Sequence, residues 1–325
     1  MQSTLFFFLA LAVAFISPAT VMGAGPRYPT QHIEVVVPYS PGGPADVMSR
    51  IVADIAPRFL GQSMVITNKT GAGGSVAAAD VVASPPDGYK LMTASNSFFA
   101  TTVKTQKIPF NPNDLVPVAN FIEDRIGLAV RGDAPWNTLG ELIDYGRKNP
   151  GKIRWAHTGK GNALHSIGLI IFRKAGVETI DIPYKGVPET ASALLGGHVD
   201  ALSGPYGSVQ EHVRSGKIKY LVVYSDRRYS DLPNVPCAEE LGFTQAANLA
   251  VLFGMYIHKN TPKDIQVTLY ESFKKTSETQ EFKKRIESIG EEPRFGGPDF
   301  VRQAIKKAET VGVPLLKELG LYVNP

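Results

Sequence analysis

The sequence contains one cysteine, Cys237, in 325 residues. A single cysteine excludes a disulfide within the chain, so the fold must depend on its hydrophobic core, and a chain of this length can bury a large one. Cys237 also lies far from the amino terminus, which excludes a lipid-anchored amino terminus. We expect its thiol to be a small, buried, apolar group.

A large excess of charge of either sign is also missing. The 34 basic and 30 acidic residues leave a net charge of +4 and are scattered along the chain. Nucleic-acid-binding proteins concentrate Lys and Arg on one face, so we expect no nucleic-acid partner. The composition suggests only a mild preference for anions.

The usual catalytic motifs are absent. The chain has no Gly-x-Ser-x-Gly elbow, no His-x-x-x-His pair and no Gly-x-x-x-x-Gly-Lys-Ser/Thr phosphate loop. "GAGGSV" and "GKGNAL" approach a dinucleotide fingerprint, but Val76 and Leu164 stand where its last glycine belongs. We therefore expect no catalytic residues, no metal ligands and no cofactor, and we favour binding without reaction.

One long apolar run is present, "LFFFLALAVAFI", and it is too short to span a bilayer comfortably. Small residues follow it, with Val21 and Gly23 at suitable −3 and −1 positions for signal peptidase. This pattern predicts a signal peptide over residues 1–23. No Lys or Arg precedes the run, which leaves an uncleaved membrane anchor as the alternative.

The rest of the chain repeats one unit: a strand, a glycine-rich loop and a helix. The unit occurs at "HIEVVVPYSPGGPADVMSRIVADI", at "SMVITNKTGAGGSVAAADVVAS", at the strand Ile153–His157 with its following helix, and at "TIDIPYKGVPETASALLGG". Such alternation predicts an α/β fold with mostly parallel sheets. The last third is amphipathic and predicted to be helical, with Pro262 and Pro298 near two helix starts.

The glycine-rich loops are candidate anion sites. A helix amino terminus has unpaired backbone N–H groups and a partial positive charge, and Gly42 and Gly43 would let an anion approach without Cβ atoms in the way. If the loops converge, they form an amide-lined cleft for one or two carboxylates. Each loop taken alone is more simply explained as a structural turn, whereas several such loops in register favour a site.

Four side chains in these loops have two explanations each. Asp46 is either a helix cap or a ligand contact. Lys160 and Lys185 either pair with a carboxylate or are exposed surface lysines. His165 either donates to a ligand or holds its own loop.

Four stretches resemble, in order and spacing, the extracytoplasmic solute-binding proteins of tripartite tricarboxylate transporters, the Bug family. They are "YPTQHIEVVVPYSPGGPADVMSRIVA", "NKTGAGGSVAAADVVASPPDGYKLM", "IPYKGVPETASALLGGHVDAL" and "FGMYIHKNTPKDIQVTLYESF". The resemblance implies a type II periplasmic binding protein: two doubly wound α/β domains with a ligand cleft between them. It implies a periplasmic, cofactor-free monomer that binds a small carboxylate and delivers it to membrane permease subunits. The implied division is domain 1 over residues 24–127 and 250–325, and domain 2 over residues 128–249.

The resemblance also implies which residues bind the ligand. They are Tyr39, Gly42, Gly43, Asp46, Ser95, Ser97, Thr158, Gly159, Lys160, Asn162, His165, Tyr184, Lys185, Gly186, Pro188, Ser203 and Tyr206.

Two stretches depart from the family pattern. "HTGKGNALH" replaces a serine-rich loop and introduces Lys160, and "SGPYGS" places Ser203 and Tyr206 where a polar residue is usual. We expect Tyr206, with Tyr39, to form an apolar far end suited to an aromatic acid or an aliphatic dicarboxylate. Phe253 either joins this wall or is ordinary core packing.

Two other functions remain open at this stage. One is a nucleotide-dependent α/β enzyme, and the other is a protein that presents its bound ligand to a sensor kinase.

Overall fold

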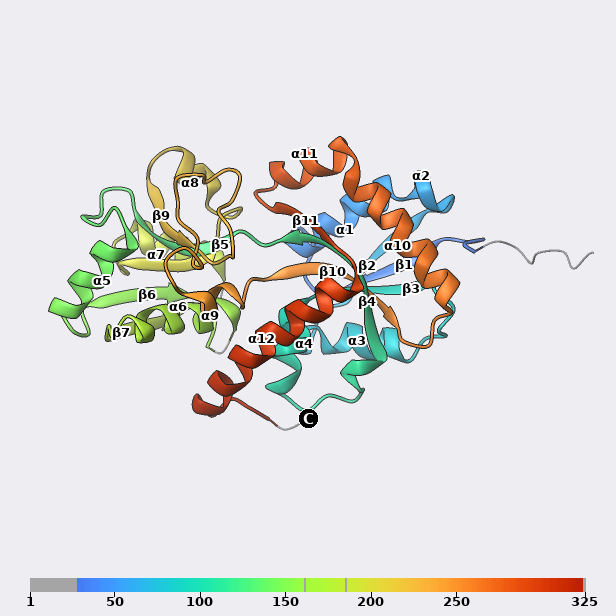
Figure 1. Cartoon of the computed structure of the whole chain (residues 1–325), viewed down its shortest axis with the longest axis horizontal. Helices are drawn as coiled ribbons and strands as arrows, with labels where there is room; N and C mark the ends of the chain where they lie inside the picture. Colours follow the sequence, from blue (N-terminus) through green and yellow to red (C-terminus); the bar gives the residue numbers. More distant parts are fainter. Residues whose placement is uncertain (1–27, 161, 185, 324–325) are drawn as a thin grey trace, which may run out of the picture.

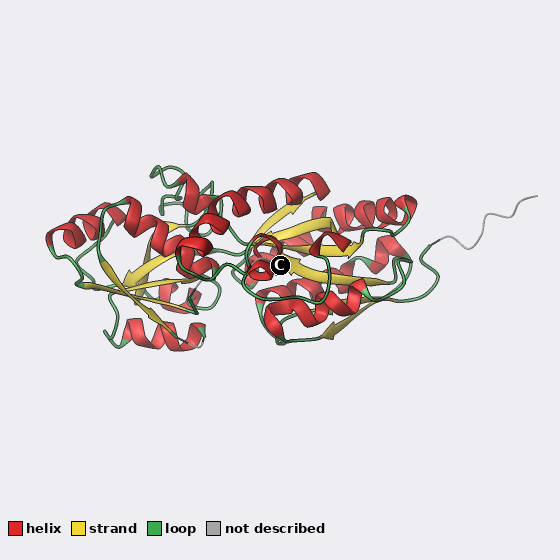
Figure 2. Cartoon of the chain, turned by 90° about the horizontal axis from the view of Figure 1, so that it is seen from below, coloured by secondary structure: helices red, strands yellow, loops and turns green. Residues whose placement is uncertain are grey.

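Two β-sheets, each covered by helices, form two lobes that lie side by side (Figure 1). This computed structural model describes residues 28–160, 162–184 and 186–323. The predicted signal peptide and Lys185 lie outside the described residues. In a view from below, the two lobes again lie side by side and meet at the centre of the molecule (Figure 2). The fold is therefore the two-domain α/β fold that the sequence predicts.

The first domain contains a six-stranded sheet of order β11-β4-β10-β3-β1-β2. Its strands are β1 (Ile33–Val37), β2 (Met64–Asn68), β3 (Lys90–Ser95), β4 (Leu115–Glu123), β10 (Leu252–His258) and β11 (Glu292–Gly296). Its helices are α1 (Pro44–Ile55), α2 (Pro57–Leu60), α3 (Ser75–Val82), α4 (Asn96–Ala100), α10 (Lys263–Glu278), α11 (Gln280–Ser288) and α12 (Pro298–Glu318). Three short 3₁₀ turns span Ala72–Gly74, Thr102–Lys104 and Pro112–Asp114. Helices α1, α10 and α11 cover one face of the sheet, and α3, α4 and α12 cover the other (Figure 1).

The second domain contains a five-stranded sheet of order β7-β6-β8-β5-β9. Its strands are β5 (Ile126–Arg131), β6 (Ile153–His157), β7 (Thr179–Pro183), β8 (Ala201–Pro205) and β9 (Ile218–Val223). Its helices are α5 (Leu139–Lys148), α6 (Ala163–Lys174), α7 (Val187–Leu195) and α8 (Gln210–Arg214), and α9 (Thr244–Ala247) lies on the way back to the first domain. None of the helices in the described part of the chain is both long enough and apolar enough to span a membrane.

The expectation of mostly parallel sheets is wrong, because both sheets are mixed. β1 pairs in parallel with β2 and β3, but β10 pairs antiparallel with β3 and β4. In the second sheet β5 pairs antiparallel with both β8 and β9. β11 also pairs antiparallel with β4. The repeated strand–helix units of the sequence include none of β5, β10 and β11, and β5 and β10 lie at the crossings between the domains.

Local sequence explains the elements that lead to the loops. Four of the five residues of β1 are buried, as expected for an interior strand covered on both faces. Helix α1 begins with Pro44, whose missing N–H is unneeded at that position. Its buried side chains, which include Met48, Ile51, Val52 and Ile55, recur at helical spacing.

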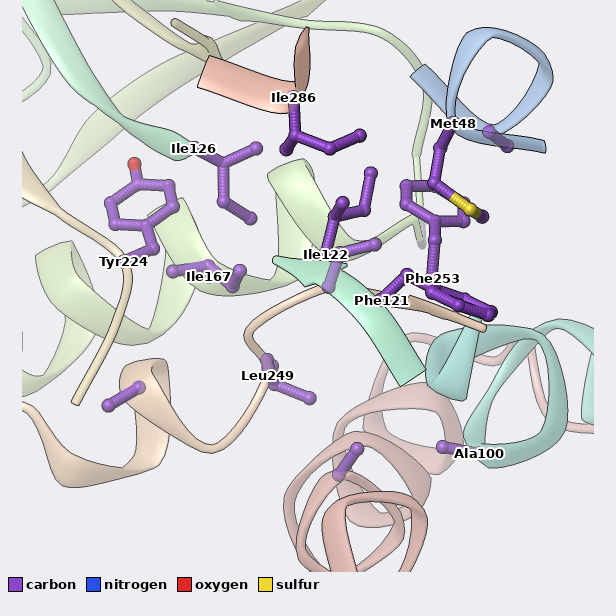
Figure 3. Close-up of a cluster of buried hydrophobic side chains, with 14 of the residues drawn as sticks. Met48, Ala100, Phe121, Ile122, Ile126, Ile167, Tyr224, Leu249, Phe253 and Ile286 are labelled. Atoms are coloured by element: carbon purple, nitrogen blue, oxygen red, sulfur yellow. The ribbon is translucent and has the colours of Figure 1, made fainter. Parts of the chain in front are cut away.

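The largest cluster of buried apolar side chains extends across the connection between the domains. Figure 3 shows Phe121, Ile122 and Phe253 of the first domain near Ile126 and Ile167 of the second. The chain passes from β4 to β5 through Asp124 and Arg125, and it returns between β9 and β10. The connection is therefore a packed crossing, and we propose it as the hinge of the molecule.

Candidate functional site

The loops that follow β1, β2 and β3 come together in the first domain. These strands are neighbours and two of the pairings are parallel, so their carboxyl ends share one edge of the sheet. Gly74 shows how closely the loops approach, because a Cβ there would lie 3.3 Å from both Phe98 and Pro38. The first-domain residues predicted to bind a ligand all lie at this edge.

Tyr39, Ser95 and Ser97 form one wall of this edge. The Tyr39 ring contacts Phe253 edge-on at 5.9 Å, and Phe253 is the strand partner of Ser95. Burial raises the pKa of the Tyr39 phenol, and a hydrogen bond with Ser95 partly offsets that rise. The Ser95 and Ser97 hydroxyls lie 2.9 Å apart, and Ser95 caps α4 by accepting the Phe98 N–H.

Asp46 closes the beginning of α1. Its carboxylate accepts the Gly42 N–H at 2.9 Å, two hydrogen bonds from Arg50 at 3.0 Å and one from Asn68 at 2.8 Å. Burial opposes ionisation of Asp46, but these hydrogen bonds outweigh it and lower its pKa. Asp46 thus holds the loop before α1 by accepting the Gly42 N–H, as its capping explanation expects; a ligand contact stays a prediction.

The remaining amides of this turn are available. Within the described residues, the backbone N–H groups of Ala45 and Asp46 have no hydrogen-bond acceptor, and that of Gly43 closes a turn with the Ser40 carbonyl only weakly. Pro44 has no N–H to offer. Gly43 has φ of −77°, a backbone conformation that any residue can adopt. A Cβ at this position would meet only the Ser40 carbonyl oxygen, at 3.8 Å.

In the second domain, the loop after β6 leads into α6. Asn162 caps this helix: its Oδ1 accepts the His165 N–H at 3.0 Å, and its Nδ2 donates to Thr158 Oγ1 at 3.0 Å. The loop passes through Gly159 at φ of +143°, a conformation that favours glycine. The amides of Ala163 and Leu164 have no acceptor among the described residues. This helix beginning therefore resembles that of α1.

The loop between β7 and α7 lies beside the previous one. The Tyr184 N–H donates to the His157 carbonyl at 2.9 Å, which fixes the two loops together. Gly186 is the residue before α7, and Pro188 lies in the first turn. Tyr184 and Pro188 line a surface hollow of about 470 Å³ together with His198.

The structure places Ser203 and Tyr206 away from an open wall. Ser203 is fully buried, donates to the Leu164 carbonyl at 2.7 Å and accepts from the Tyr224 hydroxyl at 3.1 Å. Tyr206 is 3% exposed, and its ring lies 6.1 Å from that of Tyr220. Tyr206 thus packs inside the second domain, whereas Tyr39 packs against Phe253 in the first.

A cluster of charged and imidazole side chains lies under α6; Lys160 and His165 in it were predicted from the sequence, whereas His157 and Asp181 were missed. His157 Nε2 is 3.3 Å from Asp181 Oδ2, and His165 Nε2 is 3.6 Å from the same oxygen. Lys160, on the loop above, has its Nζ 3.8 Å from that oxygen. The feature that brings the cluster together is the pairing of β6 with β7, which places Trp155 opposite Asp181 and His157 opposite Pro183.

Electrostatics sets the charge states in this cluster. Burial, reinforced by the neighbouring His157, lowers the pKa of His165 to about 4, and burial also lowers the pKa of His157. Burial opposes ionisation of Asp181, but the His157 hydrogen bond and the Lys160 charge outweigh it and lower its pKa. Near neutral pH the cluster therefore holds two neutral imidazoles and one carboxylate.

A cavity of about 290 Å³ lies between the two domains. Its lining includes Asn96, Leu252 and Arg294 from the first domain, and Asp226, Thr244 and Asn248 from the returning connection. Arg294 donates to Glu123 and, at 2.8 Å, to Asp226. None of the residues predicted from the sequence lines this cavity, so it is a separate feature beside the crossing.

Two α/β domains joined by a double crossing, with helix beginnings at the strand ends, define a solute-binding protein of the periplasmic-binding-protein class. Residues 48–321 match the model of the "Tripartite tricarboxylate transporter family receptor". The chain belongs to this family. Its family and fold are those of transporter solute-binding proteins and not of enzymes, which removes the nucleotide-dependent enzyme as an alternative.

Known proteins agree with this assignment. The chain is 31% identical to Protein BugT of Bordetella pertussis, over 95% of this chain and 97% of that protein. A TctC solute-binding protein from Polaromonas, solved without ligand, has a TM-score of 0.79 and 27% identity, covering 89% of this chain and 99% of its own.

Two further neighbours were solved with carboxylates. A Rhodopseudomonas palustris protein, Rpa4515, was solved with adipate and has a TM-score of 0.75 and 25% identity, covering 90% of this chain and 98% of its own. MatC from the same organism was solved with bound malate and has a TM-score of 0.69 and 26% identity. The match covers 88% of this chain and 100% of MatC.

Proposed function

We propose that this chain captures a small carboxylate between its two domains, in the periplasm, and delivers it to the permease of a tripartite tricarboxylate transporter. The observation that carries the proposal is the set of unpaired amides at the beginnings of α1 and α6. Each end offers backbone N–H groups and the positive end of a helix dipole, which together bind carboxylates without a basic side chain.

The ligand class follows from the same geometry and from the relatives. Two helix beginnings on different domains suit a molecule with two acidic ends, or one acidic end and an apolar body. The solved relatives carry adipate and malate, both dicarboxylates. Tyr39 and Phe253 would supply an apolar contact on the first domain, so a dicarboxylate or an aromatic carboxylate is the proposed ligand.

The proposed contacts in the first domain are the amides of Gly43, Ala45 and Asp46, with the hydroxyls of Ser95 and Ser97. In the second domain they are Thr158, the amides of Ala163 and Leu164, and Tyr184. The amide of Gly42 and the carboxylate of Asp46 serve the loop itself, because they bind each other.

Calorimetric titration with a panel of mono-, di- and aromatic carboxylates tests this function. We expect one site, no chemical change of the ligand, and at least tenfold weaker binding in Gly43→Val, whose side chain would cover the α1 amides. Gly140→Val is the matched control, since Gly140 also lies in the first turn of a helix and its Cβ would meet only Thr138 Oγ1 at 3.8 Å. Equal affinity in both variants would remove the α1 loop from the site.

Export and delivery need separate tests. Mass spectrometry of the mature protein from a periplasmic extract should show a chain that begins near Ala24. Ligand uptake by vesicles that contain the permease should require added binding protein. Uptake at the same rate without the protein would contradict the delivery role.

A further inference from the structure

We propose that His157, His165 and Asp181 form a binding site for a divalent first-row transition-metal ion, with Zn²⁺ as the ion that tests it. This site uses other atoms than the proposed carboxylate contacts, because it lies between β6, β7 and α6 and uses side chains instead of helix-end amides.

The fold brings the three ligands together from three elements. His157 ends β6, Asp181 lies in the middle of the neighbouring parallel strand β7, and His165 lies in the first turns of α6. Trp155 and His157 point to the same face of the sheet because they are two residues apart on a strand. Gly168 lets α6 approach that face, since a Cβ there would lie 2.5 Å from the Trp155 ring.

The distances suit a small metal ion. The candidate ligand atoms of all three residues lie within 4.8 Å of one another, with His157 Nε2 and His165 Nε2 at 3.3 and 3.6 Å from Asp181 Oδ2. In a tetrahedral zinc site, bonds of about 2.1 Å place ligand atoms about 3.4 Å apart. Two imidazole nitrogens and one carboxylate oxygen are a donor set that first-row ions bind well.

Burial and access are also appropriate. The side chain of His157 is 0% exposed and that of His165 is 4% exposed, so the imidazoles are held in place by their surroundings. The Asp181 side chain is 28% exposed, which leaves a route from solvent and a fourth position for water.

Two groups must move when the ion binds. Lys160 approaches the same Asp181 oxygen, but its side chain is 63% exposed and can turn into solvent. The Gly159 N–H donates to His157 Nδ1 at 3.1 Å, which places the imidazole proton on Nε2, facing Asp181. Metal binding at Nε2 transfers that proton to Nδ1, so the Gly159 amide must turn away, and the metal would thereby alter the loop that begins α6.

The test is a calorimetric titration of chelator-treated protein with ZnCl₂ alone, in the absence of any carboxylate. We expect one ion per chain, binding weakened more than about tenfold in Asp181→Asn and in His165→Gln, since even outer-shell partners contribute that much. Lys160→Ala should bind the ion more tightly, because it removes a competing cation. His212→Gln, on α8, is the control and should bind as the wild type does.

A second measurement keeps the proposal falsifiable if a variant fails to fold. Co²⁺ added to the wild type should give the intense visible bands of a tetrahedral site, and X-ray absorption of the zinc form should show two imidazoles. Absence of a saturable site in the wild type, a spectrum without histidine ligands, or unchanged binding in folded Asp181→Asn would each overturn it. None of these outcomes bears on the proposed carboxylate function, which is tested separately with the metal-free protein.

Discussion

Asn96 holds the second crossing strand against α4: its Oδ1 accepts the Leu252 N–H at 2.9 Å, while its Nδ2 donates to the Ala250 carbonyl at 3.0 Å. Asn96 is 1% exposed, so water cannot replace these hydrogen bonds. Asn96→Ala should lower the free energy of unfolding by roughly 1–3 kcal/mol, the cost of leaving buried backbone groups unpaired. Urea denaturation measures this loss of stability, and Asn260→Ala, at an exposed position, is the control. Equal unfolding midpoints for Asn96→Ala and wild type would show that the two Asn96 hydrogen bonds do not stabilise the fold.

Asp124 predicts how stability depends on pH. Burial and the negative charge of Glu123 raise its pKa to about 7, and Glu291 beside it also has a raised pKa, because of burial and the charge of Asp124. A carboxyl group whose pKa is higher in the folded state stabilises the fold at low pH, and that contribution is lost as the pH rises through about 7. The slope for one proton is at most about 1.4 kcal/mol per pH unit.

Asp124→Asn should therefore unfold with a flatter pH dependence between about pH 4 and 7 than the wild type, because the wild type loses the contribution of this proton between the unfolded-state and folded-state pKa values. Asp87→Asn, at an exposed position, should keep the wild-type dependence. Parallel curves for Asp124→Asn and wild type would show that Asp124 is ionised throughout this range.

Gly168 gives a prediction about packing. An alanine methyl group there would lie 2.5 Å from the Trp155 ring, so Gly168→Ala should destabilise the protein by roughly 1–3 kcal/mol through overpacking. Gly140→Ala is the control, because its Cβ would meet only Thr138 Oγ1, at an ordinary contact distance of 3.8 Å. Thermal denaturation compares the two; an unchanged midpoint for Gly168→Ala would mean that α6 can shift outward at little cost.

Closure of the domains on the ligand is the fourth prediction. The two domains are connected by two crossings, and ligand sites between domains commonly close by hinge motion. Small-angle scattering should show a smaller radius of gyration when the protein is saturated with its carboxylate. An unchanged radius at saturation would indicate a rigid cleft.

The sequence predicted local features well because they depend on neighbouring residues. The strand Ile153–His157 has the predicted bounds, and Pro298 begins α12 as expected. Contacts between distant residues were not predictable in the same way. Asp181 and His157 are 24 residues apart, and only strand pairing brings them together.

Burial was the second property that the sequence did not give. Ser203 and Tyr206 were predicted to face the cleft, and both are buried in this structure; whether they reach a ligand stays a prediction. Asp46 had two explanations from the sequence. Its hydrogen bond with Asn68 was not predictable, because only the fold brings that strand near.

The shared cluster of apolar side chains has a consequence for how the molecule comes apart. Ile122 and Ile126 lie on either side of the crossing and belong to one buried apolar cluster. Unfolding of either lobe would therefore expose apolar side chains of the other lobe to water. The two lobes are therefore thermodynamically coupled and should melt together, in one transition, although each has a sheet of its own.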